Sequence, residues 1–239
     1  MARTSTTTPL VALGDRVGAL SGAAYVLLIL VGNQIATGGS QDPHPSGAKD
    51  LADFAASPSA SRVVGETMEV LGFLAFIVFI GWLTQTLRDR GGAAGWLAGT
   101  ASIAGTITLA VKIASILPMA AGLLDPKEIS ATTARVLTDM NNAGFVITFL
   151  PFGVFLVAVG AAILSSGLLG KVAGWFAVVI GTLGVLLTLV TRMDPVNTNP
   201  MPFLAGLVWI LVISVRLAVK GPRSQSVPQD GRSLAPAMV

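Results

Sequence analysis

Six long apolar segments constrain the fold of this chain more than any other feature of its sequence. They cover residues about 17–37, 64–87, 95–123, 139–167, 172–192 and 201–219. A helix that crosses the hydrocarbon core of a bilayer needs roughly 20 mainly apolar residues, and each segment reaches that length. Inside a membrane the backbone must satisfy its own hydrogen bonds, which favours helices. The sequence therefore predicts an all-α polytopic membrane protein, a bundle of six transmembrane helices.

Composition agrees with this class and excludes several kinds of site. Only 11% of the 239 residues are charged, whereas soluble domains carry about a quarter. The chain has no cysteine, so it has neither disulfides nor thiolate ligands. Its one histidine, His44, lies in a polar Asp-Pro-His-Pro loop, which excludes a bis-histidine haem and argues against a zinc enzyme. We expect no cofactor, no metal and no nucleic-acid partner, and the lipid bilayer as the main partner.

The distribution of Lys and Arg predicts the orientation. With Lys112 set aside, nine basic residues lie on the side of the N-terminus and five on the other side. The nine are Arg3, Arg16, Arg88, Arg90, Lys171, Arg216, Lys220, Arg223 and Arg232, and the five are Lys49, Arg62, Lys127, Arg135 and Arg192. Because basic residues concentrate in cytoplasmic loops, both termini are predicted to be cytoplasmic and the protein to be a multi-pass plasma-membrane protein.

Three regions follow from these segments. Residues 1–13 form a short cytoplasmic N-terminal segment, residues 14–220 the six-helix domain, and residues 221–239, rich in Pro, Ser, Gln and Arg, a disordered cytoplasmic tail. The first apolar segment is expected to be a retained helix, since no small-x-small cleavage site follows it and Gly18 and Gly22 suit helix packing. The pairs Gly95/Gly99 and Gly170/Gly174 are also expected to pack within the bundle.

Three stretches carry a resemblance to a known family. They are DRVGALSGAAYVLLILVG, GETMEVLGFLAFIVFIGWLTQTLR and AGFVITFLPFGVFLVAVGAAILSSGLLGKVAGWFAVVIGTLG. In their small residues, an acid in the second segment and a Trp after the turn between the fourth and fifth segments, they resemble a large family of short bacterial six-helix membrane proteins catalogued as a domain of unknown function. The resemblance implies the architecture and no activity. Family members often have Arg and Glu in the third helix, where this chain has Lys112 and no acid.

Ionisable and amide side chains form a predicted polar layer in the outer half of the membrane. Glu66 and Glu69 share one face of the second segment, and Lys112 lies in the third. The candidate ligand or ion-pair residues are Glu66, Glu69, Lys112, Arg135, Asp139, Asn142, Arg192 and Asp194. No residue is assigned as catalytic. The amine of Lys112 is expected to reach this layer and to meet a carboxylate, with hydrogen bonds from Asn142 or Ser115 supporting the pair.

Three functions remain open at this point. A lysine in the centre of a membrane costs about 2.5–3.5 kcal/mol, and intramembrane charges are a default functional hypothesis. The first hypothesis is therefore binding or transport of a small solute or a proton through the polar layer. The second is a structural or accessory subunit of a membrane complex, in which the charges only fix helix register. The third is an intramembrane enzyme acting on a lipid, although no hydrolase, protease or transferase motif accompanies the charges.

Overall fold

The computed structural model describes residues 9–37, 60–122, 130–192, 194 and 197–220, and within these ranges every regular element is an α-helix. The helices are α1 (Pro9–Thr37), α3 (Ala60–Arg88), α4 (Gly92–Gly122), α5 (Ala131–Ile147), α6 (Phe149–Ser166), α7 (Lys171–Val190) and α8 (Met201–Lys220). The predicted tail at 221–239 and the first eight residues lie outside the described residues.

Six helical spans are long and apolar enough to cross a membrane, which confirms the predicted fold class. They are Leu13–Ala36, Val63–Arg88, Gly92–Pro118, Arg135–Ser166, Lys171–Val190 and Met201–Val219. The fourth differs from the prediction, because it begins earlier and consists of α5 and α6, which meet at Thr148. Pro151 has no N–H to donate to the carbonyl one turn back, and the Thr148 N–H is shared between the Gly144 and Phe145 carbonyls at 3.2 Å each.

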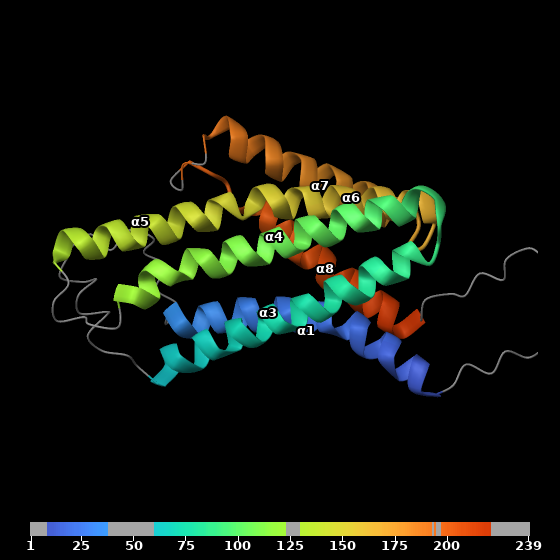
Figure 1. The fold of residues 1–239 in the computed structure, drawn as a ribbon, viewed down its shortest axis with the longest axis horizontal. Coiled ribbons are helices and arrows are strands. Elements are labelled where there is room, and N and C mark those ends of the chain that lie inside the picture. The colour runs from blue at the N-terminus through green and yellow to red at the C-terminus, as the bar shows by residue number, and fades with distance from the viewer. Residues whose placement is uncertain (1–8, 38–59, 123–129, 193, 195–196, 221–239) are drawn as a thin grey trace, which may run out of the picture.

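The helices form a closed ring in which each packs against its neighbours in the chain. The most extensive of these contacts are those of α1 with α3, α3 with α4, α4 with both α5 and α6, α6 with α7, and α7 with α8. Contact between α8 and α1 closes the ring, and Figure 1 shows α8 crossing behind the bundle. We call the end where α3 begins and α4 finishes the Glu69 end, and the opposite end, with the α3–α4 and α6–α7 turns, the Arg88 end.

Glycines make the tight turns at the Arg88 end. Between α3 and α4 the chain reverses through Gly91 and Gly92, whose φ angles are 69° and 56°. Between α6 and α7 it reverses through Gly167 and Gly170, with φ of 70° and 83°. These left-handed conformations are strained for residues with a Cβ, so glycine ends one helix and lets the antiparallel partner begin.

A continuous series of aromatic rings fills the centre of the bundle. Starting in α5, the neighbouring ring centroids lie 4.9–5.1 Å apart along the path Phe145, Phe149, Phe203, Phe152. The path continues from Phe152 to Phe155 at 6.2 Å, and then through Phe76 to Tyr25. Offset and edge contacts of this kind add about 0.5–1.5 kcal/mol per pair beyond burial. The aromatic side chains belong to α1, α3, α5, α6 and α8, so most helices of the bundle share one aromatic core.

Small residues let several helices approach closely. A Cβ built on Gly18 would meet the Trp82 side chain, and one on Gly22 would meet Phe79 at 2.6 Å, which confirms that this pair packs against the bundle. At the other end of α1, Gly32 lies against Gly65 of α3 so closely that a Cβ on Gly65 would be 2.5 Å from the Gly32 carbonyl oxygen. At Gly32 and Gly65 the α1–α3 interface is therefore a backbone contact, which is a common way for helices to pack in membranes.

The prediction for the other glycine pairs holds only in part. Gly174 of α7 packs against α6, where a Cβ would lie 2.6 Å from Leu164, whereas Gly170 forms the turn before it. Gly95 and Gly99 of α4 are different, because a Cβ added at either would have no described atom of another helix within 4 Å. The prediction that they pack inside the bundle is therefore wrong, and they lie on the outer face of α4.

Exposed tryptophans and helix lengths place the polar residues within the membrane. Trp96 and Trp175 are more than half exposed near the Arg88 end, where amphipathic indole rings favour the membrane interface. From Trp96, Lys112 is about 24 Å along α4, and from Arg88, Glu69 is about 28 Å along α3, at about 1.5 Å per residue. Since the hydrocarbon core is about 30 Å thick, both side chains lie near its opposite boundary.

Candidate functional site

The amine of Lys112 lies over an aromatic ring. Its Nζ is 4.7 Å from the centroid of the Phe145 ring, which α5 brings against α4. A cation over an aromatic face gains about 0.5–2 kcal/mol, with the larger values in desolvated surroundings. The expected hydrogen bond from Ser115 does not reach the amine, because the Ser115 hydroxyl donates to the Lys112 carbonyl at 2.7 Å. The contact with the Phe145 ring therefore offsets part of the free-energy cost of placing the Lys112 amine in the membrane.

Glu69 lies on α3, the helix that packs against α4 and its Lys112. It is half-buried on α3 and accepts a hydrogen bond from Asn33 Nδ2 of α1 at 3.5 Å. The preceding residue of α1, Gly32, would place a Cβ only 3.2 Å from the Glu69 backbone nitrogen. The close α1–α3 contact therefore positions Asn33 beside the carboxylate.

Lys112 and Glu69 lie on the contacting helices α4 and α3 without forming a contact ion pair. A close ion pair is formed instead by Arg135 and Asp139 of α5, whose atoms Nε and Oδ2 are 3.9 Å apart. Within the described ranges the Lys112 amine makes the ring contact and no hydrogen bond. Its three N–H donors are thus available to an added acceptor.

The structure separates several residues that the sequence placed in one layer. Arg135 and Asp139 pair with each other on an exposed face of α5, with side chains 81% and 61% exposed. Asp139 is about 40 Å from the end of α6 at about 1.5 Å per residue, so it projects beyond a hydrocarbon core of about 30 Å. Glu66 is exposed on α3, and Asn142 is half-buried one turn before Phe145. The centre of the site is therefore Lys112 with Glu69.

Arg192 and Asp194 belong to the connection between α7 and α8. Arg192 has φ of 55°, a left-handed conformation that is uncommon outside glycine. The Asp194 carboxylate accepts from Asn197 Nδ2 at 2.6 Å, and its carbonyl accepts from the Thr198 hydroxyl at 2.6 Å. These bonds build a tight cap between two helices, so both residues shape this connection.

Two residues of the site were not found from the sequence. Phe145 is one of many apolar residues in its span, although it lies three positions after Asn142 and so shares its face. Asn33 is the first of two amide residues in the sequence LVGNQ near the end of the first apolar segment. Its position could have been found from the sequence, because a polar residue within an apolar span usually hydrogen-bonds to another helix.

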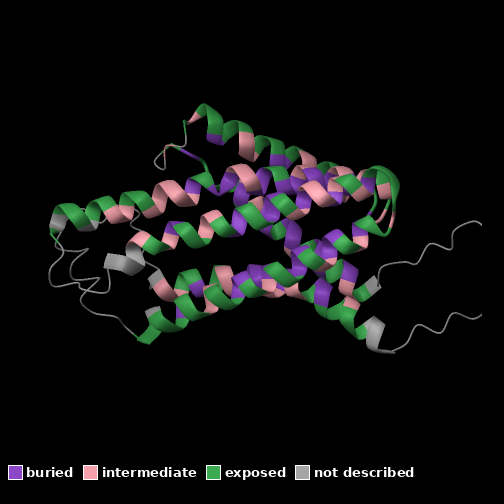
Figure 2. Ribbon diagram, viewed as in Figure 1, coloured by how far each residue is buried: buried purple, intermediate pink, exposed green. Residues whose placement is uncertain are grey.

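The Glu69 end of the bundle is more open than its middle. Buried residues concentrate in the centre and toward the Arg88 end, whereas the Glu69 ends of α3, α4 and α5 are mainly exposed or half-buried (Figure 2). Among the described residues, no group of three or more His, Cys, Asp or Glu side chains is placed to hold a metal ion. The chemistry on offer is an ammonium group and a hydrogen-bonded carboxylate, close to the membrane boundary.

The fold and the site define an integral membrane protein with six membrane-spanning helices and a charged pair near one boundary of the membrane. The model of the family described as a domain of unknown function, DUF4386, matches residues 20–221. The chain belongs to this family. A search of curated proteins and a search of solved structures each found no match.

Proposed function

We propose that this protein binds a small anionic or zwitterionic solute at Lys112, and that the Glu69 end faces the outside of the plasma membrane. Binding there is the first step of transport. In this proposal the six-helix domain covers residues 14–220 and both termini are cytoplasmic, as the distribution of Lys and Arg favours.

One observation carries the proposal: the Lys112 amine has opposite charge nearby but no acceptor in contact among the described residues. A lysine that served only as a structural pin would gain most from a direct, hydrogen-bonded carboxylate. Here the amine instead lies over Phe145 with its donors available. A carboxylate or phosphate group would satisfy them, and the ammonium of a zwitterion would find the Glu69 carboxylate on the facing helix.

Ligand-induced stabilisation tests the proposal. The purified protein in nanodiscs is heated with acetate, lactate, phosphate, glycine or glycine betaine, and the melting temperature is compared with that of Lys112→Gln. A solute at 100 times its Kd stabilises by about 2.7 kcal/mol, which corresponds to a rise of about 5–10 °C for a chain of this length. We expect the rise in the wild type and its loss in Lys112→Gln.

The control is Lys171→Gln, which removes an exposed lysine at the Arg88 end of α7. It should keep the full response. A response that survives in Lys112→Gln, or a wild type that responds to none of the five solutes, contradicts a solute site at Lys112.

A structural role is the second candidate, favoured by the ring packing around Lys112. Phe145 stacks edge-on against Phe149 at 5.1 Å and against Phe203 at 5.6 Å, so the amine is attached to the aromatic core. In this role the charges fix the register of α3, α4 and α5 within an accessory subunit. A Lys112→Met/Glu69→Gln double variant should then match the wild type in stability, since an apolar replacement for both charges is often neutral or stabilising.

A further inference from the structure

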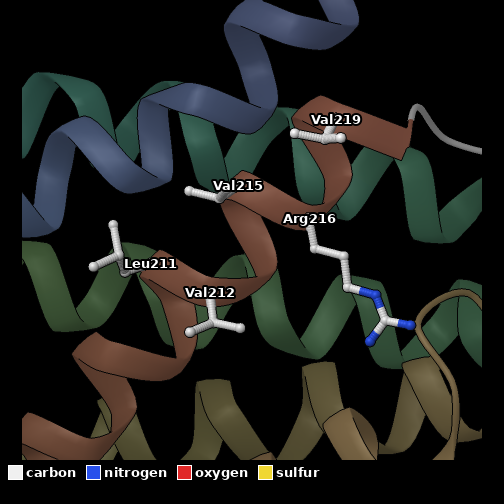
Figure 3. A pocket seen from close by; sticks show the side chains of 5 residues that line it. All are labelled: Leu211, Val212, Val215, Arg216 and Val219. Carbon is white, nitrogen blue, oxygen red and sulfur yellow. The ribbon is translucent and has the colours of Figure 1, made fainter.

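We propose that the Arg88 end of α8 carries a binding site for one anionic phospholipid. The site is a shallow hollow on the exposed side of the helix, separate from the Lys112 region. Its lining residues are Leu211, Val212, Val215, Arg216 and Val219 (Figure 3). Leu211, Val215 and Val219 follow one another at intervals of four, as do Val212 and Arg216, so the hollow lies between two adjacent ridges of one helix.

The hollow suits an acyl chain. Its surface is wholly apolar, because Arg216 contributes its methylene groups while the guanidinium extends away from the apolar side chains (Figure 3). Val212, Val215 and Val219 are 57%, 46% and 79% exposed, so this side of α8 is not covered by another described helix. Leu211 to Val219 covers about 12 Å at about 1.5 Å per residue, which is the length of a large part of one acyl chain.

Charge selects the headgroup. Arg216 is exposed and lies about 6 Å from the end of α8 at Lys220, at about 1.5 Å per residue. An arginine at this depth extends its guanidinium to the interface, where planar N–H donors match phosphate oxygens. Other exposed basic residues at the same end are Arg16, Arg88 and Lys171. If this end is cytoplasmic, as the charge distribution predicts, it faces the leaflet that attracts basic groups through its anionic lipids.

The combination of hollow and cation favours lipid over other occupants. In a two-fold dimer through this hollow, a second copy of this chain would present the same arginine to the same surface, and like charges oppose such pairing. A neutral zwitterionic lipid would fill the hollow with its chain but gain less from the guanidinium. An anionic phospholipid uses both features at once.

Native mass spectrometry of the full chain tests the site. The protein is released from micelles containing phosphatidylglycerol or phosphatidylcholine with identical acyl chains, and the fraction carrying one lipid is measured together with the oligomeric mass. We expect retained phosphatidylglycerol in the wild type and about tenfold weaker retention in Arg216→Gln, the effect of losing a hydrogen bond to a charged group. Arg216→Lys should retain an intermediate fraction, since it keeps the charge and loses the planar geometry.

Two further variants separate a built site from general attraction to positive charge. Val212→Trp fills the hollow from its exposed side and should lower retention without changing the melting temperature. Arg88→Gln removes an exposed arginine at the same end and should leave retention unchanged. Equal retention of both lipids, full retention in Val212→Trp, or equal losses in Arg88→Gln and Arg216→Gln would overturn the proposal. A dimer that forms in the wild type and disappears in Val212→Trp would instead identify a second copy as the occupant, and would also overturn it.

Discussion

Replacing Gly65 by alanine should weaken the protein by forcing α1 and α3 apart. The added Cβ would lie 2.5 Å from both the Gly32 carbonyl oxygen and the Ala36 nitrogen. Both are backbone atoms, so no side chain can rotate to relieve the contact. The helices would have to separate by at least 0.5 Å to bring it to 3.0 Å. Overpacking of a well-packed interface costs about 1–3 kcal/mol.

A matched glycine in the same helix isolates that cost. Gly81 also lies within α3, and a Cβ there has no described atom within 4 Å beyond its own helix backbone. Both replacements gain the same helix propensity of about 0.5–1 kcal/mol, since alanine restricts the unfolded chain. The difference between Gly65→Ala and Gly81→Ala is therefore the contact alone, about 1–3 kcal/mol. For a chain of this length it corresponds to a difference in melting temperature of about 2–12 °C.

Thermal unfolding in detergent, followed by circular dichroism, measures the difference. We expect Gly81→Ala to melt at or slightly above the wild type, and Gly65→Ala clearly below both. Separation of α1 from α3 should also weaken the proposed solute binding, because the α1–α3 contact holds Asn33 beside Glu69. A Gly65→Ala variant that melts as high as Gly81→Ala would show that the two backbones are not in contact there.

Three other predictions follow from the described geometry. Phe145→Leu should lower the free energy of unfolding. A double-mutant cycle of Phe145→Leu with Lys112→Met, measured by denaturant unfolding, should give a coupling energy of about 0.5–2 kcal/mol if the ring contacts the amine. A coupling energy near zero would argue against that contact. Trp82→Phe removes an indole N–H that donates 3.2 Å to a carboxylate in α1 and should cost about 1.5–3 kcal/mol by the same measurement, with an unchanged stability counting against the bond. In the cysteine-free chain, Ser46→Cys should react with an impermeant thiol reagent in intact cells and Ser226→Cys only after permeabilisation; labelling of Ser226→Cys in intact cells would reverse the topology.

The architecture could be predicted because membranes impose strong local rules. Span length, apolar composition and the need for internal backbone hydrogen bonds identified all six helices without any tertiary information. The break between α5 and α6 at Thr148 was harder to predict from the sequence. Pro151 indicated a weak point, but the place where the helix is interrupted depends on how the Thr148 N–H and hydroxyl are shared with the preceding turn.

The site could be predicted only in part, because helix spacing gives faces but not which helices meet. Lys112 and Glu69 are both candidates from the sequence alone, since a charge inside an apolar span is conspicuous in any sequence. Their relation to Phe145 and Asn33 depends on contacts between helices, which periodicity does not provide. Arg135 and Asp139 show the converse error. Their spacing correctly placed them on one face, but that face extends beyond the membrane because α5 starts earlier than expected.

Gly95 and Gly99 illustrate the same limit. A GxxxG spacing indicates that another helix could pack closely at this position, but it does not show that a partner helix is present. In this bundle α4 turns its buried alanines, such as Ala98 and Ala101, toward the core and these glycines outward.

Whether the Lys112 amine receives the solute is tested most directly by the nitrogen-15 NMR signal of its Nζ. Protein labelled at lysine nitrogen is studied in nanodiscs, the Lys112 signal is assigned with Lys112→Gln, and the solute that stabilises the protein most is titrated in. We expect the Lys112 signal to shift in a saturable way with the same Kd as the thermal stabilisation, while the Lys171 signal stays in place. Glu69→Gln should change the starting position of the Lys112 signal. A Lys112 signal that stays unchanged while the protein is being stabilised would place the solute elsewhere and contradict a solute site at this amine.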